Sequence, residues 1–330
     1  MRLSYPFATL TPHTPWERRV SLRDKVIIEV GLNENQPRSA NPHIAYSPEE
    51  LARDALACSS AGAAVVHYHG RDPVTGAAKN SDPALTSQAQ RLIAARTPLV
   101  AYPTYASERR VLDHYDIGEP AKERYRHIVE GVESGVPFEL APVDLGAADA
   151  NARRNTQTGG WTPSTGLLMN TGEDHRWLTS FCRRHNLKMS FGAFDTGHLR
   201  NLRNLADMAW AGAPPFVVKF FLRPMDATPQ TLFFYRDRLA ELFHNEALVW
   251  SPLTYGGNQF PLNLQALTLG GHIRIGIGDY HYAEWGHPTN AALVERVVAM
   301  ARALGREPAT PDEARAIMGM PPAPKAGQRT

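Results

Sequence analysis

Eight short apolar runs recur along the chain, separated by longer segments in which apolar residues return every three or four positions. The runs cover residues 26–32, 64–69, 98–103, 138–142, 188–193, 216–222, 247–250 and 272–276. Apolar runs of this length are typical of strands buried on both faces, as in a parallel sheet. The alternation of strand and helix predicts an α/β protein.

The segment between the first two runs carries clear helix signals. Ser47 and Glu50 have the spacing of a capping box, Pro48 falls in the first turn, and Gly62 follows the last turn. Leu51 and Cys58 fall on one face at helical spacing. We therefore expect a helix here that packs its apolar side against the strands.

The strand–helix unit repeats without a linker rich in proline, glycine or serine until the end of the chain. This pattern predicts a single (β/α)₈ TIM barrel over residues 26–320, with an N-terminal arm at 1–25 and a flexible tail at 321–330. The long polar segment at 145–166 is expected to form a loop over the carboxyl-terminal mouth of the barrel, where active sites of this fold lie.

Composition narrows the range of partners. The 35 basic and 33 acidic residues give a formal charge of +2, which does not favour nucleic acid or an anionic membrane as a partner, so a small molecule is expected. No apolar run is long enough for a signal peptide or a membrane span. Cys58 and Cys182 are expected to be reduced, which fits a cytoplasmic protein.

Two histidines stand one residue apart in the second run, VVHYHGRD. Because strand side chains alternate, His67 and His69 share one face near the end of the strand, with Cα atoms about 6.6 Å apart. Their ring nitrogens could converge on one divalent ion. Hydrogen bonding within a polar layer of the barrel is the alternative. The position at the carboxyl end of the second strand favours a metal site.

Five stretches together resemble the β-keto acid cleavage enzyme family: VVHYHGRD, SPEELARDALACSSAGA, FDTGHL, LGGHIRIG and ALGREPATPDEARAIMG. The resemblance extends over about residues 25–320. It implies a (β/α)₈ barrel, usually oligomeric as a dimer or tetramer, in which His67 and His69 bind Zn²⁺ or another divalent metal. It also implies a reaction of a β-keto acid with acetyl-CoA that gives acetoacetate and a new acyl-CoA.

One family position departs from the pattern. Arg274 and Asp279 match the family's proton-transferring pair, but the glutamate that would complete the zinc site is Gly278 here. Asp279, His281 and Glu34 are the candidate replacements. Near the end of the first strand the family's acidic residue aligns with Asn35, and a one-residue bulge could exchange Asn35 with Glu34.

The remaining candidates concern the substrate. Glu34, Asn35, Arg71 and Thr104 are expected to orient it, and the short loop after the sixth strand puts the contacts to CoA in doubt. Lys219 is an unexpected charge in the sixth strand, and we expect it to pair with Glu29 across the barrel interior or to contact the substrate.

The most consistent interpretation is a zinc-dependent enzyme that cleaves a C–C bond of a β-keto acid, with Arg274 and Asp279 as catalytic residues. Two alternatives stay open. One is a metal-independent lyase that forms a Schiff base on Lys219, and the other is a non-catalytic relative that binds a keto acid.

Overall fold

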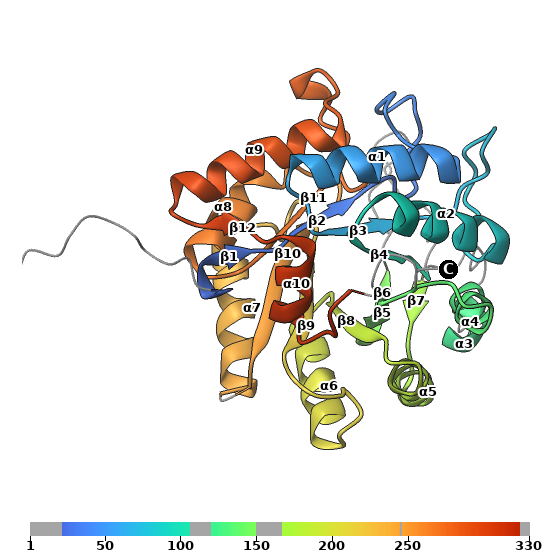
Figure 1. Cartoon of the computed structure of the whole chain (residues 1–330). Helices are drawn as coiled ribbons and strands as arrows, with labels where there is room; N and C mark the ends of the chain where they lie inside the picture. The colour runs from blue at the N-terminus through green and yellow to red at the C-terminus, as the bar shows by residue number, and fades with distance from the viewer. Residues whose placement is uncertain (1–21, 106–119, 150–166, 245, 324–330) are drawn as a thin grey trace, which may run out of the picture.

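The computed structural model describes residues 22–105, 120–149, 167–244 and 246–323. Eight parallel strands form the wall of a barrel (Figure 1), in the order β2 (Ile28–Gly31), β3 (Val65–Tyr68), β4 (Val100–Pro103), β5 (Leu140–Asp144), β8 (Lys188–Ala193), β9 (Phe216–Leu222), β10 (Leu248–Thr254) and β11 (Ile273–Ile275). Ladders join β11 through β4 and β5 through β10, while β4 lies beside β5 and β10 beside β11. The predicted (β/α)₈ barrel is confirmed.

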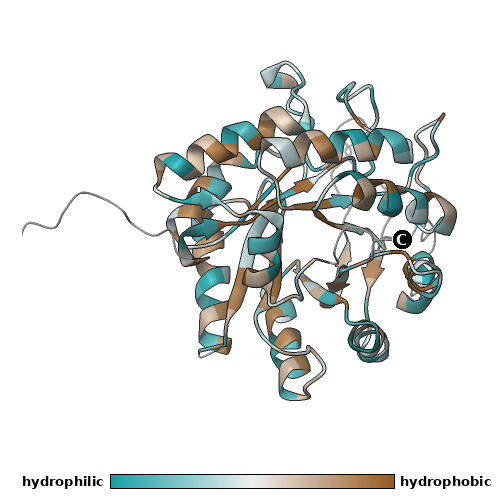
Figure 2. Ribbon diagram, in the orientation of Figure 1, coloured by the Kyte–Doolittle hydropathy of each residue, from teal (hydrophilic) through white to brown (hydrophobic). Residues whose placement is uncertain are grey.

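Helices surround this wall. They are α1 (Pro48–Ala61), α2 (Pro83–Arg96), α3 (Ala121–Arg124), α4 (Arg126–Glu133), α5 (Gly172–Arg184), α6 (Thr196–Asp207), α7 (Pro229–Leu242), α8 (Phe260–Thr268) and α9 (Asn290–Ala303). The predicted capping box of α1 is present, and Gly62 ends the helix in the left-handed conformation. Cys58 is buried on α1, and both cysteines are free. In Figure 2 the strands are mostly brown, whereas the surrounding helices alternate between brown and teal. None of the described helices is both long and apolar enough to cross a bilayer.

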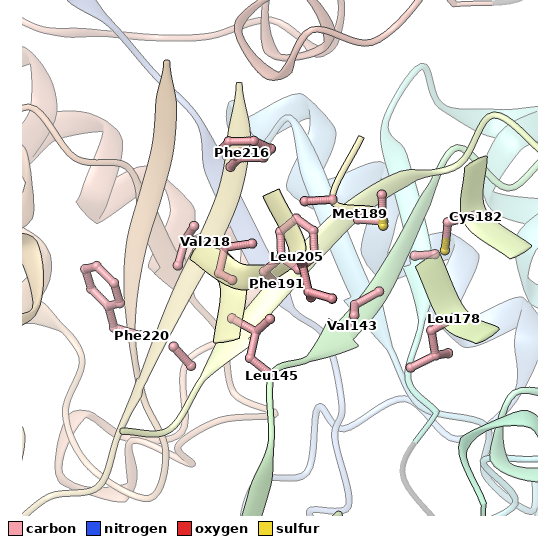
Figure 3. Close-up of a cluster of buried hydrophobic side chains, with 14 of the residues drawn as sticks. Val143, Leu145, Leu178, Cys182, Met189, Phe191, Leu205, Phe216, Val218 and Phe220 are labelled. Atoms are coloured by element: carbon pink, nitrogen blue, oxygen red, sulfur yellow. The ribbon is translucent and has the colours of Figure 1, made fainter. Parts of the chain in front are cut away.

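The main apolar layer lies between the wall and the helices. Figure 3 shows Val143, Phe191 and Val218 on three neighbouring strands, close to Leu178 and Leu205 of the helices outside the wall. Because strand side chains alternate, residues next to these in sequence face the barrel interior. This alternation decides which polar side chains reach the site.

Apolar side chains fill the amino-terminal half of the interior. Val65, Leu140 and Val217 lie there on three of the strands. They pack against Ala314 and Met318, which both belong to α10 (Pro311–Met318). Helix α10 thus closes this end of the barrel (Figure 1). Polar and charged side chains follow on the same strands toward the opposite end, so the chemistry lies at the carboxyl-terminal mouth.

Several boundaries differ from the sequence prediction. Strand β10 continues four residues beyond Trp250, where the predicted strand ended. Ser251 and Pro252 look like a strand end in the sequence, but the barrel accommodates both of them within the strand. The predicted loop at 145–166 is wrong at its start, where β6 (Ala147–Asp149) pairs with β7 (Leu167–Met169), and 150–166 lies outside the described residues. Of the predicted arm and tail, 1–21 and 324–330 also lie outside them.

The end of the predicted arm takes part in the fold. Residues Leu22–Asp24 form a 3₁₀ turn, and β1 (Lys25–Val26) pairs in parallel with β12 (Glu307–Pro308). The division of the chain into arm, barrel and tail otherwise stays a prediction.

Candidate active site

His67 and His69 point into the barrel from the end of β3. Val66 and Tyr68 pack outward against α1 and α2, which confirms the parity inferred from the sequence. The two imidazole rings lie 5.2 Å apart and are nearly perpendicular, and both side chains are buried. Burial lowers the pKa of His67 well below its ordinary value, against the opposing pull of the Glu34 carboxylate. His67 is therefore neutral, the form that binds a metal.

Glu34 turns its carboxylate onto both histidines. Its Oε1 lies 3.6 Å from His67 Nε2, and its other oxygen contacts His69 Nε2. The backbone of Glu34 has a φ of 38°, in the left-handed region that non-glycine residues rarely adopt. Such a conformation persists only where surrounding contacts impose it, and it is concentrated at functional sites. This turn brings Glu34 into the cluster in place of its neighbour Asn35.

Asn33 fixes the turn that carries Glu34. Its side-chain oxygen accepts a hydrogen bond from His69 N at 2.9 Å, and its amide donates to the carbonyls of His69 and Ala45, both at 3.0 Å. Asn33 is completely buried, so these bonds replace those it would make with water. Asn33 was not identified from the sequence, although a polar residue next to the last apolar position of a strand was a usable signal.

The cluster of Glu34, His67 and His69 has the donor set of a divalent metal site. One ligand atom from each residue lies within 4.8 Å of the others, and all three side chains are buried. Nδ1 of each histidine has no hydrogen-bond partner among the described residues, an unusual state for buried polar atoms. Two imidazoles and one carboxylate are the protein ligands of many catalytic zinc sites. The residues present fit the metal that the family resemblance implies.

Neither of the other two candidate ligands joins this cluster. Asp279 is fully buried and binds Arg274 through both oxygens at 2.9 Å. Nδ1 of His281 accepts a hydrogen bond from Ala283 N at 3.1 Å, and the side chain is partly exposed. Glu34 is thus the third residue that the geometry supplies.

Gly278 is a site of close backbone approach rather than a vacated ligand position. A Cβ there would lie 2.8 Å from three backbone atoms, namely Asn33 N, Glu34 N and Gly31 O. Gly278 N also donates to the carbonyl of Gly31 at 3.1 Å. The turn carrying Glu34 therefore rests directly on Gly278, which leaves no room for a side chain.

We expect Gly278→Ala to lower the free energy of unfolding by about 1–3 kcal/mol, because the added carbon forces the backbone turn outward. Denaturant titration would measure this change. Gly172→Ala is the matched control, since a Cβ at that position meets nothing within 4 Å. Equal stability of the two variants would contradict the close approach, and a metal-affinity gain in Gly278→Glu would restore the view that a ligand was lost.

Arg274 holds three buried carboxylates together. Its guanidinium donates to Glu29 and to Glu34 at 2.5 Å each, and to Asp279 at 2.9 Å. Although burial disfavours the charge, these carboxylates raise the pKa of Arg274 well above its ordinary value. Burial raises the pKa of Asp279, opposed by Arg274. Gln259 donates to the same carboxylate at 3.0 Å and was not identified from the sequence.

The predicted ion pair between Lys219 and Glu29 is confirmed. Lys219 Nζ lies 2.7 Å from Glu29 Oε1 and also contacts the hydroxyl of Tyr102, which itself donates to Glu29 at 2.6 Å. Burial opposes the charge of Glu29, but Lys219 and Arg274 lower the pKa of the carboxyl to about 2. The Tyr102 ring lies 4.6 Å from the His67 ring. The group of Lys219, Glu29 and Tyr102 therefore packs directly against the histidine cluster.

Lys219→Met should destabilise the protein by roughly 3 kcal/mol, because the substitution leaves Glu29 buried without one of its two cations. Urea unfolding of this variant and of Lys122→Met would test the estimate. Lys122 is an exposed surface residue, and its loss should cost less than about 0.5 kcal/mol. A neutral result for Lys219→Met would mean that the pair contributes nothing.

The expected substrate-orienting residues have different surroundings. Asn35 is exposed on the turn, outside the cluster. Arg71 donates to the main-chain carbonyls of Gly76, Glu34 and Gln36 at 2.7–3.0 Å, so it secures the Glu34 turn, and its contact with a substrate stays a prediction. Thr104 is buried at the end of β4, and its carbonyl bonds to the His127 ring at 2.7 Å.

The fold and the cluster define a class of protein: a (β/α)₈ barrel with a two-histidine, one-carboxylate site at its carboxyl-terminal mouth. Over residues 25–320 the sequence matches the beta-keto acid cleavage enzyme family. The chain belongs to that family.

Curated relatives cover most of the chain. A "3,5-dioxohexanoate:acetyl-CoA acetone transferase" of Paraburkholderia graminis is 28% identical over 290 residues, which are 85% of this chain and 90% of that protein. A "3-keto-5-aminohexanoate cleavage enzyme" of Fusobacterium nucleatum is 24% identical over 318 residues, 91% of this chain and 99% of the other. A solved structure, the binary complex of ObcA with oxaloacetate, superposes with a TM-score of 0.65 at 18% identity over 84% of this chain and 68% of that one, which supports the fold alone.

Proposed function

We propose that this chain is a metal-dependent enzyme that transfers the acyl group of a β-keto acid to CoA. In this reaction R–CO–CH₂–COO⁻ and acetyl-CoA give R–CO–S–CoA and acetoacetate. The bond between the keto carbon and the CH₂ group breaks, and the same CH₂ group bonds to the acetyl carbon. The observation that carries the proposal is the cluster of Glu34, His67 and His69 beside Arg274 at the barrel mouth.

Glu34, His67 and His69 would hold the metal. A bound divalent ion would act there as a Lewis acid toward the keto oxygen of the substrate. The charges around it suit an anionic substrate. Three buried carboxylates, those of Glu29, Glu34 and Asp279, face two cations, Arg274 and Lys219, so a divalent ion leaves a net positive site for the carboxylate of a keto acid.

Arg274 and Asp279 are the proposed proton-transfer pair. The CH₂ group between two carbonyls must lose a proton before it can attack acetyl-CoA. Arg274 Nη2 contacts both Glu34 and Asp279, so it is the atom of this pair nearest the ligand cluster. Because burial raises the pKa of Asp279, its carboxylate is a stronger proton acceptor than an ordinary aspartate. Glu29 and Gln259 hold the pair in place.

The test is turnover of purified, zinc-loaded protein with acetyl-CoA and a panel of six-carbon 3-keto acids. The panel contains 3-keto-5-aminohexanoate, 3,5-dioxohexanoate, 3-oxohexanoate and 3-oxoadipate. Acetoacetate and a new acyl-CoA should appear in equal amounts with at least one member. Absence of both products with every member would defeat the proposal in favour of a non-catalytic relative.

The Schiff-base alternative has a separate signature. If a Schiff base formed on Lys219, borohydride added during turnover would reduce it and attach the substrate covalently to this residue. We expect no adduct, because the Lys219 ammonium is held by Glu29 and Tyr102. An adduct at Lys219 by peptide mass analysis would support the lyase. The dimer or tetramer implied by the family stays a prediction.

A further inference from the structure

Asp144, at the end of β5, faces the barrel interior near the mouth. Its neighbours Val143 and Leu145 belong to the apolar layer outside the wall (Figure 3), so the side chain between them points the other way. In the ladder Asp144 pairs with Gly192, and Gly192 pairs with Lys219. Asp144 is therefore in the same ring of inward-facing positions as Lys219.

Gly192 makes room for this carboxylate. A Cβ at Gly192 would overlap Asp144 Oδ1 and would lie 2.9 Å from Cε2 of Phe221. The carboxylate thus extends over the backbone of β8 toward the barrel axis and the aromatic ring on β9. Any larger residue at position 192 would displace it.

The Asp144 carboxylate is charged and has no ion-pair partner within 4.0 Å in the described part of the chain. The Tyr105 hydroxyl accepts hydrogen bonds from Asp144 N at 2.9 Å and from Asn170 at 2.7 Å. Burial raises the pKa of Asp144 to about 6, against Tyr105, Arg124 and Lys219. The group is mostly ionised at neutral pH.

Aromatic rings line the space beside this charge. Phe221 follows Lys219 by two residues on β9, so it also faces the interior. Its ring stacks on that of Phe194 at 4.4 Å with an interplanar angle of 20°. A half-buried carboxylate next to aromatic faces is a favourable environment for an ammonium group, through charge pairing and cation–π attraction.

We propose that Asp144 and Phe221 form a specificity subsite that binds a positively charged group at the far end of the keto acid. This inference rests on the proposed function for the identity of the substrate. A keto acid held at the Glu34–His67–His69 end by its carboxylate and keto oxygen would extend across the mouth toward β5. Asp144 would attract a distal ammonium group there and repel a second carboxylate.

Binding in the absence of acetyl-CoA tests the subsite separately from catalysis. Calorimetry on the zinc-loaded protein would compare 3-keto-5-aminohexanoate, 3-oxohexanoate and 3-oxoadipate for the wild type and Asp144→Asn. We expect the wild type to bind the amine at least about tenfold more tightly than the neutral acid, and 3-oxoadipate most weakly. Asp144→Asn should remove most of the preference for the amine while changing the affinity for 3-oxohexanoate less than about threefold.

The control is Asp226→Asn, which removes an exposed carboxylate from the loop after β9 at the same end of the barrel. It should leave the order of affinities unchanged. Equal affinities for all three acids in the wild type, or an equal loss for all three in Asp144→Asn, would overturn the subsite. Selective binding without turnover would keep the subsite and defeat the proposed function, whereas turnover without selectivity would do the reverse.

Discussion

Arg274→Met is expected to lower the free energy of unfolding by at least about 5 kcal/mol, the largest stability effect of any single change considered for this chain. The guanidinium contacts Glu29, Glu34 and Asp279, and all three carboxylates are buried. If the Arg274 cation is removed, the three carboxylates keep Lys219, which pairs with Glu29, as their one lysine or arginine partner among the described residues of the barrel interior. Since natural domains are stable by roughly 5–15 kcal/mol, much of the variant should be unfolded.

Urea titration and thermal melting would measure the loss. Arg274→Lys keeps the charge with fewer donors, so an intermediate stability is expected and gives a result even if the methionine variant does not fold. Arg238→Met is the control, because the exposed pair of Arg238 with Glu241 should contribute less than about 1 kcal/mol. Similar stability of Arg274→Met and Arg238→Met would contradict the role assigned to Arg274.

The second large effect concerns activity. His69→Ala and Glu34→Gln should each lower kcat/KM at least about a thousandfold with the best panel substrate, because loss of Lewis-acid activation removes several kcal/mol of transition-state stabilisation. Both residues lie at the mouth and outside the packed apolar layers, so the barrel should stay folded, as circular dichroism would check.

His281→Ala provides the matched control for these activity measurements. His281 is near the same mouth, but among the described residues its ring makes a hydrogen bond only with the main chain of Ala283. Its replacement should change kcat/KM by less than about threefold. Comparable losses in His281→Ala and His69→Ala would mean that the assignment of the cluster is wrong.

The fold was predictable because burial repeats with a strict period. Strands β8 and β9 have the bounds that their apolar runs indicate, and the capping box of Ser47 and Glu50 marks the start of α1. The parity of His67 and His69 was equally readable, because alternation along a strand depends on local geometry alone. Their role as ligands remains a prediction.

The rest of the site depended on backbone geometry that residue spacing does not encode. Glu34 enters the cluster through a left-handed φ, and Gly278 permits that turn from the far end of the sequence. Alignment by spacing alone therefore chose Asn35. Asp144 was overlooked because Pro142 resembles the end of a strand, whereas β5 continues to residue 144. Arg71 secures the same turn through three main-chain carbonyls, contacts that residue spacing does not indicate.

Glu34, His67 and His69 are proposed to bind one divalent ion together. Elemental analysis of tag-free protein, purified without chelator, tests it most directly when the wild type is compared with the His67→Ala/His69→Ala variant and with Glu34→Gln. We expect about one zinc or other divalent ion per wild-type chain, almost none in the double variant, and an affinity at least about a hundredfold weaker in Glu34→Gln by zinc competition. Equal metal content in the wild type and the double variant would contradict it.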